Sequence, residues 1–125
     1  MRAIEKLLSK ANSVLLDPRT ELVNLKNKKI IDGAYDGYIN GFGPTVITSG
    51  LIPTLATFAA DTKKQKVLDA IAQIASIDNK INSIDLLNHC LAYSSDQAKL
   101  WLWKEKIINA SIALKLMIRT FDITD

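Results

Sequence analysis

The stretch from Tyr35 to Thr62 constrains the fold of this chain most strongly. It carries most of the glycines, two of the three prolines and a long apolar pattern that few polar residues interrupt. Its first apolar side chains fall at helical spacing: Tyr35, Tyr38, Ile39, Phe42 and Val46. Because this spacing gives one face of a helix, and no run alternates as a strand requires, we expect a helical segment at the centre of the fold.

Glycine and proline predict how this central segment is built. Gly33, Gly37 and Gly41 recur at every fourth residue and so share a second helix face. Glycine costs about 1 kcal/mol relative to alanine inside a helix, so we expect a compensating close approach of a neighbouring helix backbone. Pro44 is expected to kink the helix or divide it in two. Gly50 is expected in the left-handed conformation just past the helix end.

Apolar spacing predicts further helices before and after this stretch. The first helix is expected to end at about residue 16, and a second to begin at about residue 51. Three more are expected over about 62–77, over about 84–92, and from 94–96 to about 121. Asp61 or Thr62 is expected to cap the third of these. The charged stretch 21–31 is either a loop or the solvated start of the glycine-bearing helix. The chain is therefore predicted to be all-α, a compact single domain of residues 1–125 that forms a bundle of five to six helices with a long basic C-terminal helix.

The C-terminal helix is apolar on two faces. The first face has residues spaced alternately three and four apart, which predicts packing into the bundle: Leu100, Trp103, Ile107, Ala110, Leu114, Met117 and Phe121. Trp101, Ile108 and Ile112 lie on the opposite side. A helix of this kind is either sandwiched inside the bundle or partly covered by another protein. These three residues are the candidate protein interface.

Positive charge is spread unevenly along the chain. The net charge is +3 and the isoelectric point is near 9.0. Residues 67–98 carry one Lys and four Asp, whereas residues 99–121 carry five Lys or Arg and one Glu. Lysine and arginine contact phosphates whatever the base sequence, although solvated surface lysines are the ordinary alternative. The candidate contacts with an RNA backbone are Lys26, Lys28, Lys29, Lys63, Lys64, Lys66, Lys115 and Arg119.

No catalytic, metal or cofactor site is predicted. His89 and Cys90 are adjacent, which places their side chains about 100° apart on a helix, and the chain has no second histidine or cysteine to complete a metal shell. We expect a structural pair that is buried or half-buried. The glycines match neither the dinucleotide-binding pattern nor the P-loop, and the acids are scattered singly. The residues predict a protein that is not an enzyme and has no small-molecule substrate.

The sequence also predicts where the protein works. One cysteine excludes an internal disulfide and fits a reducing compartment. The N-terminal residues are amphipathic and lack the apolar core of a signal peptide, and no apolar run is long enough to span a membrane. We expect a cytoplasmic protein.

The end of the central stretch resembles a known family. Residues 46–58 read VITSGLIPTLATF. They are similar to the signature of the small all-helical subunit of the type III-B CRISPR effector, the RNA-targeting Cmr complex, in which a helix ends in a polar residue and Gly, followed by Leu, a few variable residues, Leu-Ala and an aromatic. Length, helix order and the basic terminal helix also agree.

This resemblance implies a non-catalytic subunit for antiviral defence that stacks in a few copies along a filament of repeated backbone subunits. Its implied partners are the other subunits of the effector complex, copies of itself, and the guide and target RNA. Target cleavage would belong to other subunits. Sequence would be read by base pairing, so this subunit needs to supply only charge and shape.

A second hypothesis is a helical protein–protein interaction module or homo-oligomer without nucleic acid. It would bind through the glycine face of the central helix or through the face that carries Trp101. An enzyme would need an activity that depends on His89 or on one of the acids, and the residues disfavour this hypothesis.

Overall fold

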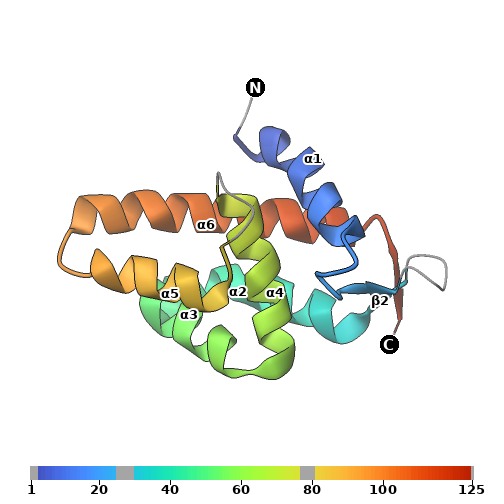
Figure 1. Cartoon of the computed structure of the whole chain (residues 1–125), viewed down its shortest axis with the longest axis horizontal. Helices are drawn as coiled ribbons and strands as arrows, with labels where there is room; N and C mark the ends of the chain where they lie inside the picture. Colours follow the sequence, from blue (N-terminus) through green and yellow to red (C-terminus); the bar gives the residue numbers. More distant parts are fainter. Residues whose placement is uncertain (1–2, 25–29, 77–80, 125) are drawn as a thin grey trace.

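The chain folds into six helices and three short strands within the part that the structure describes (Figure 1). The structure is a computed structural model and describes residues 3–24, 30–76 and 81–124. The helices are α1 (Ala3–Leu16), α2 (Gly33–Ser49), α3 (Leu51–Ala60), α4 (Thr62–Ala75), α5 (Ser83–Ala92) and α6 (Gln97–Ile118). The strands are β1 (Val23–Asn24), β2 (Ile30–Asp32) and β3 (Asp122–Thr124). The predicted all-α bundle with a long basic C-terminal helix is confirmed.

The long helix α6 runs along the length of the molecule; α2, α3, α4 and α5 gather on one side of it, and α1 extends to the other side (Figure 1). α5 runs back alongside the first half of α6, and α1 crosses its second half. α4 passes through the middle of the bundle and contacts α6, α3 and α1. α2 also packs on α6, so α6 is a common support for three other helices.

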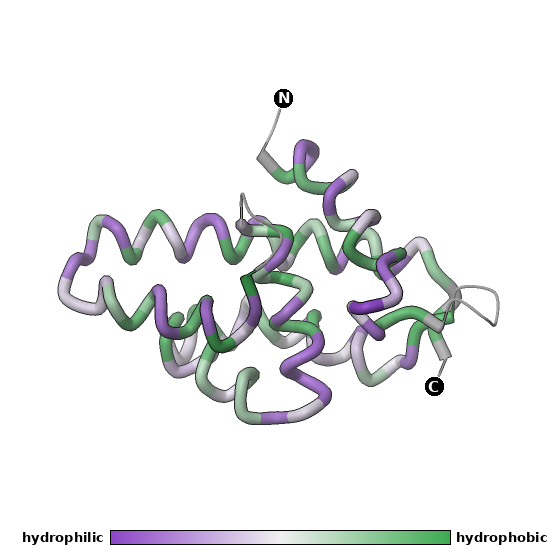
Figure 2. The backbone as a smooth tube through the Cα atoms, in the orientation of Figure 1, coloured by the Kyte–Doolittle hydropathy of each residue, from purple (hydrophilic) through white to green (hydrophobic). Residues whose placement is uncertain are grey.

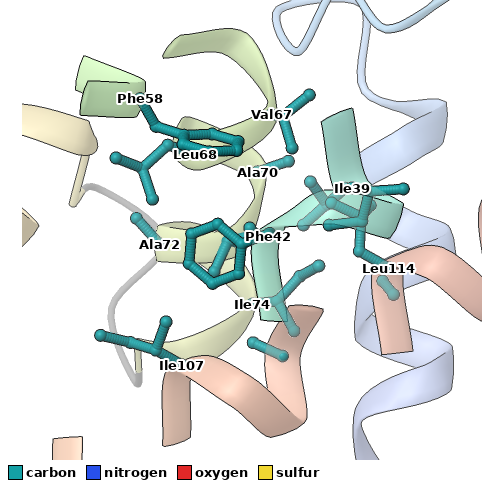
Figure 3. Packing of buried hydrophobic residues seen from close by; sticks show 14 of the residues in the cluster. Ile39, Phe42, Phe58, Val67, Leu68, Ala70, Ala72, Ile74, Ile107 and Leu114 are labelled. Carbon is teal, nitrogen blue, oxygen red and sulfur yellow. The ribbon is translucent and has the colours of Figure 1, made fainter. Parts of the chain in front are cut away.

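The centre of the core is built from α2, as its apolar spacing predicts. Tyr35, Ile39, Phe42 and Val46 are all buried. The ring of Phe42 meets the ring of Phe58 from α3 edge to face, with centroids 5.2 Å apart (Figure 3). Buried side chains from α4 and α6 surround this pair. An aromatic pair of this kind adds about 1 kcal/mol to the free energy gained from burial alone.

The predictions for the glycine face and for Pro44 are wrong in part. A Cβ atom built at Gly37 or at Gly41 would meet nothing within 4 Å, apart from the helix's own nearby backbone. No neighbouring backbone therefore approaches these two glycines, and both are exposed. Pro44 lies inside α2, which continues past it to Ser49, so the proline does not divide the helix.

Polar side chains cap the starts of α4, α5 and α6, and Asp61 is the cap that the sequence predicts for α4. The carboxylate of Asp61 accepts hydrogen bonds from the backbone N–H groups of Lys63 and Lys64, both 3.0 Å long. Asp96 caps α6, and Asn82 caps α5 in a reciprocal capping box with Asp85. These side chains satisfy N–H groups that have no partner inside a helix.

Three short strands occupy stretches for which no strand was predicted. β1 pairs antiparallel with β2, and β2 pairs parallel with β3. The stretch 21–31 was expected to be a loop or the start of a helix, whereas it contributes β1 and the beginning of β2. α6 was expected to reach about Phe121, but it ends at Ile118 and the chain then forms β3. Ile31, in the central strand β2, is fully buried. The small sheet joins the C-terminal residues to the start of α2.

Most helices carry both apolar and polar residues, and α6 carries apolar and polar residues along its whole length (Figure 2). Its predicted seam is confirmed. Ile107, Ala110 and Leu114 are buried, and Leu100, Trp103, Met117 and Phe121 are partly buried against the core. None of the described helices is long and apolar enough to cross a membrane.

Candidate functional site

The first group of candidate cations lies in the first turns of α4. Lys63 is exposed. The ammonium of Lys64 lies 5.7 Å from the ring centroid of Tyr38 and 5.6 Å from that of Phe58, within the range of cation–π attraction. The ammonium of Lys66 lies 3.0 Å from a carboxylate oxygen of Glu21, and the hydrogen bond to Glu21 raises its pKa. Lys63 and Lys64 therefore offer more unpaired charge than Lys66.

The second group lies at the end of α6, beside α2. The guanidinium of Arg119 donates a hydrogen bond of 3.0 Å to the side-chain oxygen of Asn40, and its Nε lies 4.0 Å from Asp36. Asn40 also donates to Asp36, so these three side chains form one polar cluster. Lys115 precedes Arg119 by one helical turn and is half-buried.

These two groups lie on opposite flanks of α2. Tyr38, which contacts Lys64, and Asn40, which contacts Arg119, are two residues apart and so about 200° apart around the helix. Gly37 and Gly41 lie on the outer face between them. The structure therefore places an open glycine face between two cationic flanks. Lys26, Lys28 and Lys29, the remaining candidates, lie outside the described residues.

A hollow lies between parts of α2 and the second half of α6. It measures about 250 Å³ and is lined mainly by apolar side chains: Ile39, Asn40, Gly43, Pro44, Ile47, Ile108, Ser111, Ile112 and Lys115. Two of the three candidate interface residues, Ile108 and Ile112, therefore lie partly buried in this hollow.

Trp101 has a different environment near the start of α6. Its side chain is 58% exposed and lines a second hollow of about 330 Å³, together with Leu51, Gln97, Leu100 and Lys104. Trp101 precedes Ile108 by seven residues, so both lie on one face of α6. The alternative in which the bundle buries this face completely is wrong for Trp101.

Sequence reasoning missed three other exposed apolar residues near this face. Ile47 is 75% exposed, Leu102 55% and Leu116 44%. Ile47 falls outside the buried α2 positions, which are spaced at i, i+4, i+7 and i+11, so a helical wheel of α2 would have identified it as exposed. Leu102 and Leu116 likewise lie outside the seam of α6 that packs into the bundle.

His89 and Cys90 have structural surroundings, as the sequence predicts. The His89 ring packs edge to face on Tyr93 and Trp103, with centroids 5.1 and 4.6 Å away. Cys90 is fully buried, and burial raises the pKa of its thiol to about 11. A thiol with such a pKa is a poor nucleophile at neutral pH. Among the described residues, no group of three or more His, Cys, Asp and Glu side chains could hold a metal ion.

Comparison with known proteins identifies the family. The family model described as "CRISPR-associated protein (Cas_Cmr5)" matches residues 20–121. A crystal structure of a CRISPR-associated Cmr5 family protein from Thermus thermophilus has the same fold, with a TM-score of 0.73 over 98% of this chain and 99% of that chain, at 12% sequence identity. A search of curated proteins finds no match. Since the family model matches most of the residues, the chain belongs to the Cmr5 family of CRISPR-associated proteins, the small subunits of the type III-B Cmr complex.

Proposed function

We propose that this chain is a non-catalytic subunit that stacks in a few copies along the filament of the Cmr effector complex and contacts the backbone of the guide and target RNA. Family membership is the observation that carries this proposal. The whole chain acts as a single domain, since buried residues of all six helices contribute to one apolar cluster. Its place of action is the cytoplasm, with the other subunits as partners.

The charges around α2 support an RNA contact. Lys64 lies on one flank, with Lys63 next to it in the first turn of α4, and Lys115 and Arg119 lie on the other. Gly37 and Gly41 lie between them and have no side chains to hold a strand away. Phosphates can approach a helix closely where its residues lack a Cβ. The candidate Lys66 would add to this charge, as would Lys26, Lys28 and Lys29, which lie outside the described residues. Contacts of this kind position a strand without reading its sequence, which fits recognition by a guide RNA.

The surroundings of the residues that could act in catalysis support a role without catalysis. Cys90 is buried with a raised pKa, and His89 is enclosed by two aromatic rings. The carboxylate of Asp61 is engaged in capping α4. The proposal therefore assigns cleavage of the target to other subunits.

A salt titration of RNA binding tests this proposal. The purified chain should bind a single-stranded RNA with micromolar affinity, and the affinity should fall steeply between low and physiological salt. The doubly substituted Lys63→Glu/Lys64→Glu chain should bind more weakly and lose about 1.4 from the slope of log K against log salt, at about 0.7 for each phosphate contact. A chain with Lys6→Glu, on α1, controls for a change of surface charge alone. Equal losses in the two variants would contradict the proposed path.

A protein-interaction module without nucleic acid is the second candidate function, and the exposure of Trp101 favours it. Tryptophan is enriched among residues that dominate binding energies at interfaces. In this case the chain would bind protein partners with little salt dependence, and Trp101→Ala would abolish that binding. RNA affinity would then be unmeasurable in the same titration.

A further inference from the structure

The two hollows beside α6 follow one another along the same face of that helix. The first lies between α2 and residues 108–115, and the second lies between Leu51, where α3 begins, and residues 97–104. α3 follows α2 after a single residue, so one run of chain lines both hollows opposite α6. Lys104 of one hollow and Ile108 of the other are one helical turn apart, about 6 Å. We call the two hollows together the α6 groove.

The α6 groove is apolar, and the charged residues that line it are lysines. Ile47 and Trp101 both line it and are 75% and 58% exposed. Lys104 lines one hollow and Lys115 the other, and the described lining of the two hollows contains no acid. Volumes of about 250 and 330 Å³ lie at or below the lower end for small-molecule pockets. The groove therefore suits aliphatic side chains of a protein segment that also carries an acid.

The outer face of α5 has the complementary chemistry. Ile84 and Leu91 are 45% and 44% exposed and lie seven residues apart, so they share one face of the helix. Asn88 lies between them on that face and is exposed. Residues 83–92 contain no lysine or arginine, and their one acid is Asp85, which is exposed next to Ile84. We call Ile84, Asp85 and Leu91 the α5 face.

The two surfaces lie on different sides of α6. α5 runs beside the first half of α6, where His89 packs on Trp103 (Figure 1). Trp103 and Ile108, which lines the groove, are five residues apart and so about 140° apart around α6. A chain therefore does not cover its own groove with its own α5, and it presents both surfaces to its neighbours at once.

We propose that the α5 face of one copy of this chain docks in the α6 groove of the next copy. Ile84 and Leu91 lie about 10 Å apart along α5, and the inner ends of the hollows lie about 6 Å apart, so the two side chains can enter one hollow each. Asp85 then lies near Lys115 when α5 points one way along the groove and near Lys104 when it points the other way. Its charge is matched in either direction.

A contact between two different surfaces is head to tail and can repeat. Each copy in a row uses its groove on one side and its α5 face on the other, whereas a two-fold contact would close at two copies. The inference rests on the proposed function, because stacking along a filament needs a contact that repeats. Two aliphatic side chains and one ion pair make a small interface, so the isolated chain should associate weakly, with a dissociation constant of about 0.1–1 mM.

Mixing two variants, each with one surface blocked, tests this contact. Ile47→Asp places an acid in the groove, and Leu91→Asp places a charge on the α5 face; both positions are exposed, so the fold should persist. Each variant alone should stay monomeric in sedimentation velocity up to about 1 mM, because every contact would use a blocked surface. An equimolar mixture should form a 1:1 dimer and nothing larger, since one intact groove and one intact α5 face remain to pair.

Two controls keep this test specific. Leu102→Asp changes an apolar residue that is 55% exposed on α6 and lines neither hollow, so that variant should associate as the original chain does. Lys104→Glu/Lys115→Glu should weaken association about fivefold, because it replaces an attraction to Asp85 by a repulsion. Lys6→Glu, on α1, should not weaken it, and circular dichroism should be the same for all these variants.

Several results would overturn the head-to-tail contact. These are an original chain that stays monomeric up to about 1 mM, a blocked variant that still associates by itself, or a mixture that does not form the dimer. Normal self-association of Ile47→Asp, together with loss of another Cmr subunit from the isolated complex, would assign the groove to that subunit instead. The purified mixture contains no RNA and no other subunit, so its failure leaves RNA binding and membership of the complex untouched, and those are measured separately.

Discussion

Replacing two glycines of α2 by alanine should stabilise this protein. Gly37 and Gly41 lie inside the helix and are exposed, and a Cβ atom at either position would meet nothing within 4 Å. Alanine is therefore accommodated without any movement. It restricts the unfolded chain and favours the helix, and each replacement contributes about 0.5–1 kcal/mol.

The double variant Gly37→Ala/Gly41→Ala should gain about 1.5 kcal/mol, because the helix propensities of exposed positions add along a helix. A chain of 125 residues has an unfolding entropy of about 0.26 kcal/mol/K. The midpoint of thermal unfolding should therefore rise by about 6 °C. Calorimetry together with urea unfolding measures both quantities.

Gly50 supplies the matched control. Its φ of +93° lies in a region that residues with a side chain rarely adopt, although a Cβ there would make only an ordinary contact, 3.6 Å from Pro53. Gly50→Ala should cost about 1–2 kcal/mol through its backbone alone. A loss of stability in the Gly37 and Gly41 variants would refute the conclusion that this face of α2 is open. It would favour the original prediction that a neighbouring helix backbone packs closely against the glycines.

Three other predictions follow from the core and from two titratable groups. Phe42→Ala should cost about 3–5 kcal/mol in urea unfolding, because it removes a fully buried ring and its edge-to-face contact with Phe58. Hydrogen bonds from Arg19 lower the pKa of Asp17 from 3.8 to about 2. The stability that this carboxylate supplies is therefore complete above about pH 4 and is lost as the pH falls toward 2. In the Asp17→Asn variant, the free energy of unfolding should change less with pH between 4 and 2. The thiol of Cys90, with a pKa of about 11, should resist a maleimide at neutral pH in the folded chain and react rapidly in urea.

The helices could be predicted from sequence because their signals are local. Apolar residues of α2 at helical spacing identified its buried face. Acids and amides at the starts of α4, α5 and α6 are side chains that commonly cap helices, and Asp61 was a predicted cap. Each of these signals depends on neighbours within one or two turns.

The parts that sequence could not supply depend on distant residues. β2 pairs with β3, so Ile31 lies beside Ile123, and nothing near either residue indicates that pairing. The prediction of a helix packed against the glycines was wrong for a similar reason. The spacing of the glycines shows that they share one face of α2, but it does not show whether another helix lies against that face.

The candidate site was predictable in its residue types and not in its arrangement. Charge density along the chain identified Lys63, Lys64 and Arg119. Only the fold shows that they lie on two flanks of α2 and that Lys66 pairs with Glu21. The exposure of Ile47 could have been anticipated from a helical wheel of α2, and the exposure of Trp101 required the packing of α6 to be known.

Isolation of the native complex through a tag on this chain tests the central claim most directly. Mass spectrometry and sequencing of the bound RNA should find the chain with the other Cmr subunits and with guide RNA. Ultraviolet cross-linking should attach RNA to peptides of α2 or α4, and Lys63→Glu/Lys64→Glu should reduce that cross-linking while the protein composition stays the same. A tagged chain recovered without the other subunits, or a complex whose RNA never cross-links to this chain, would contradict the account.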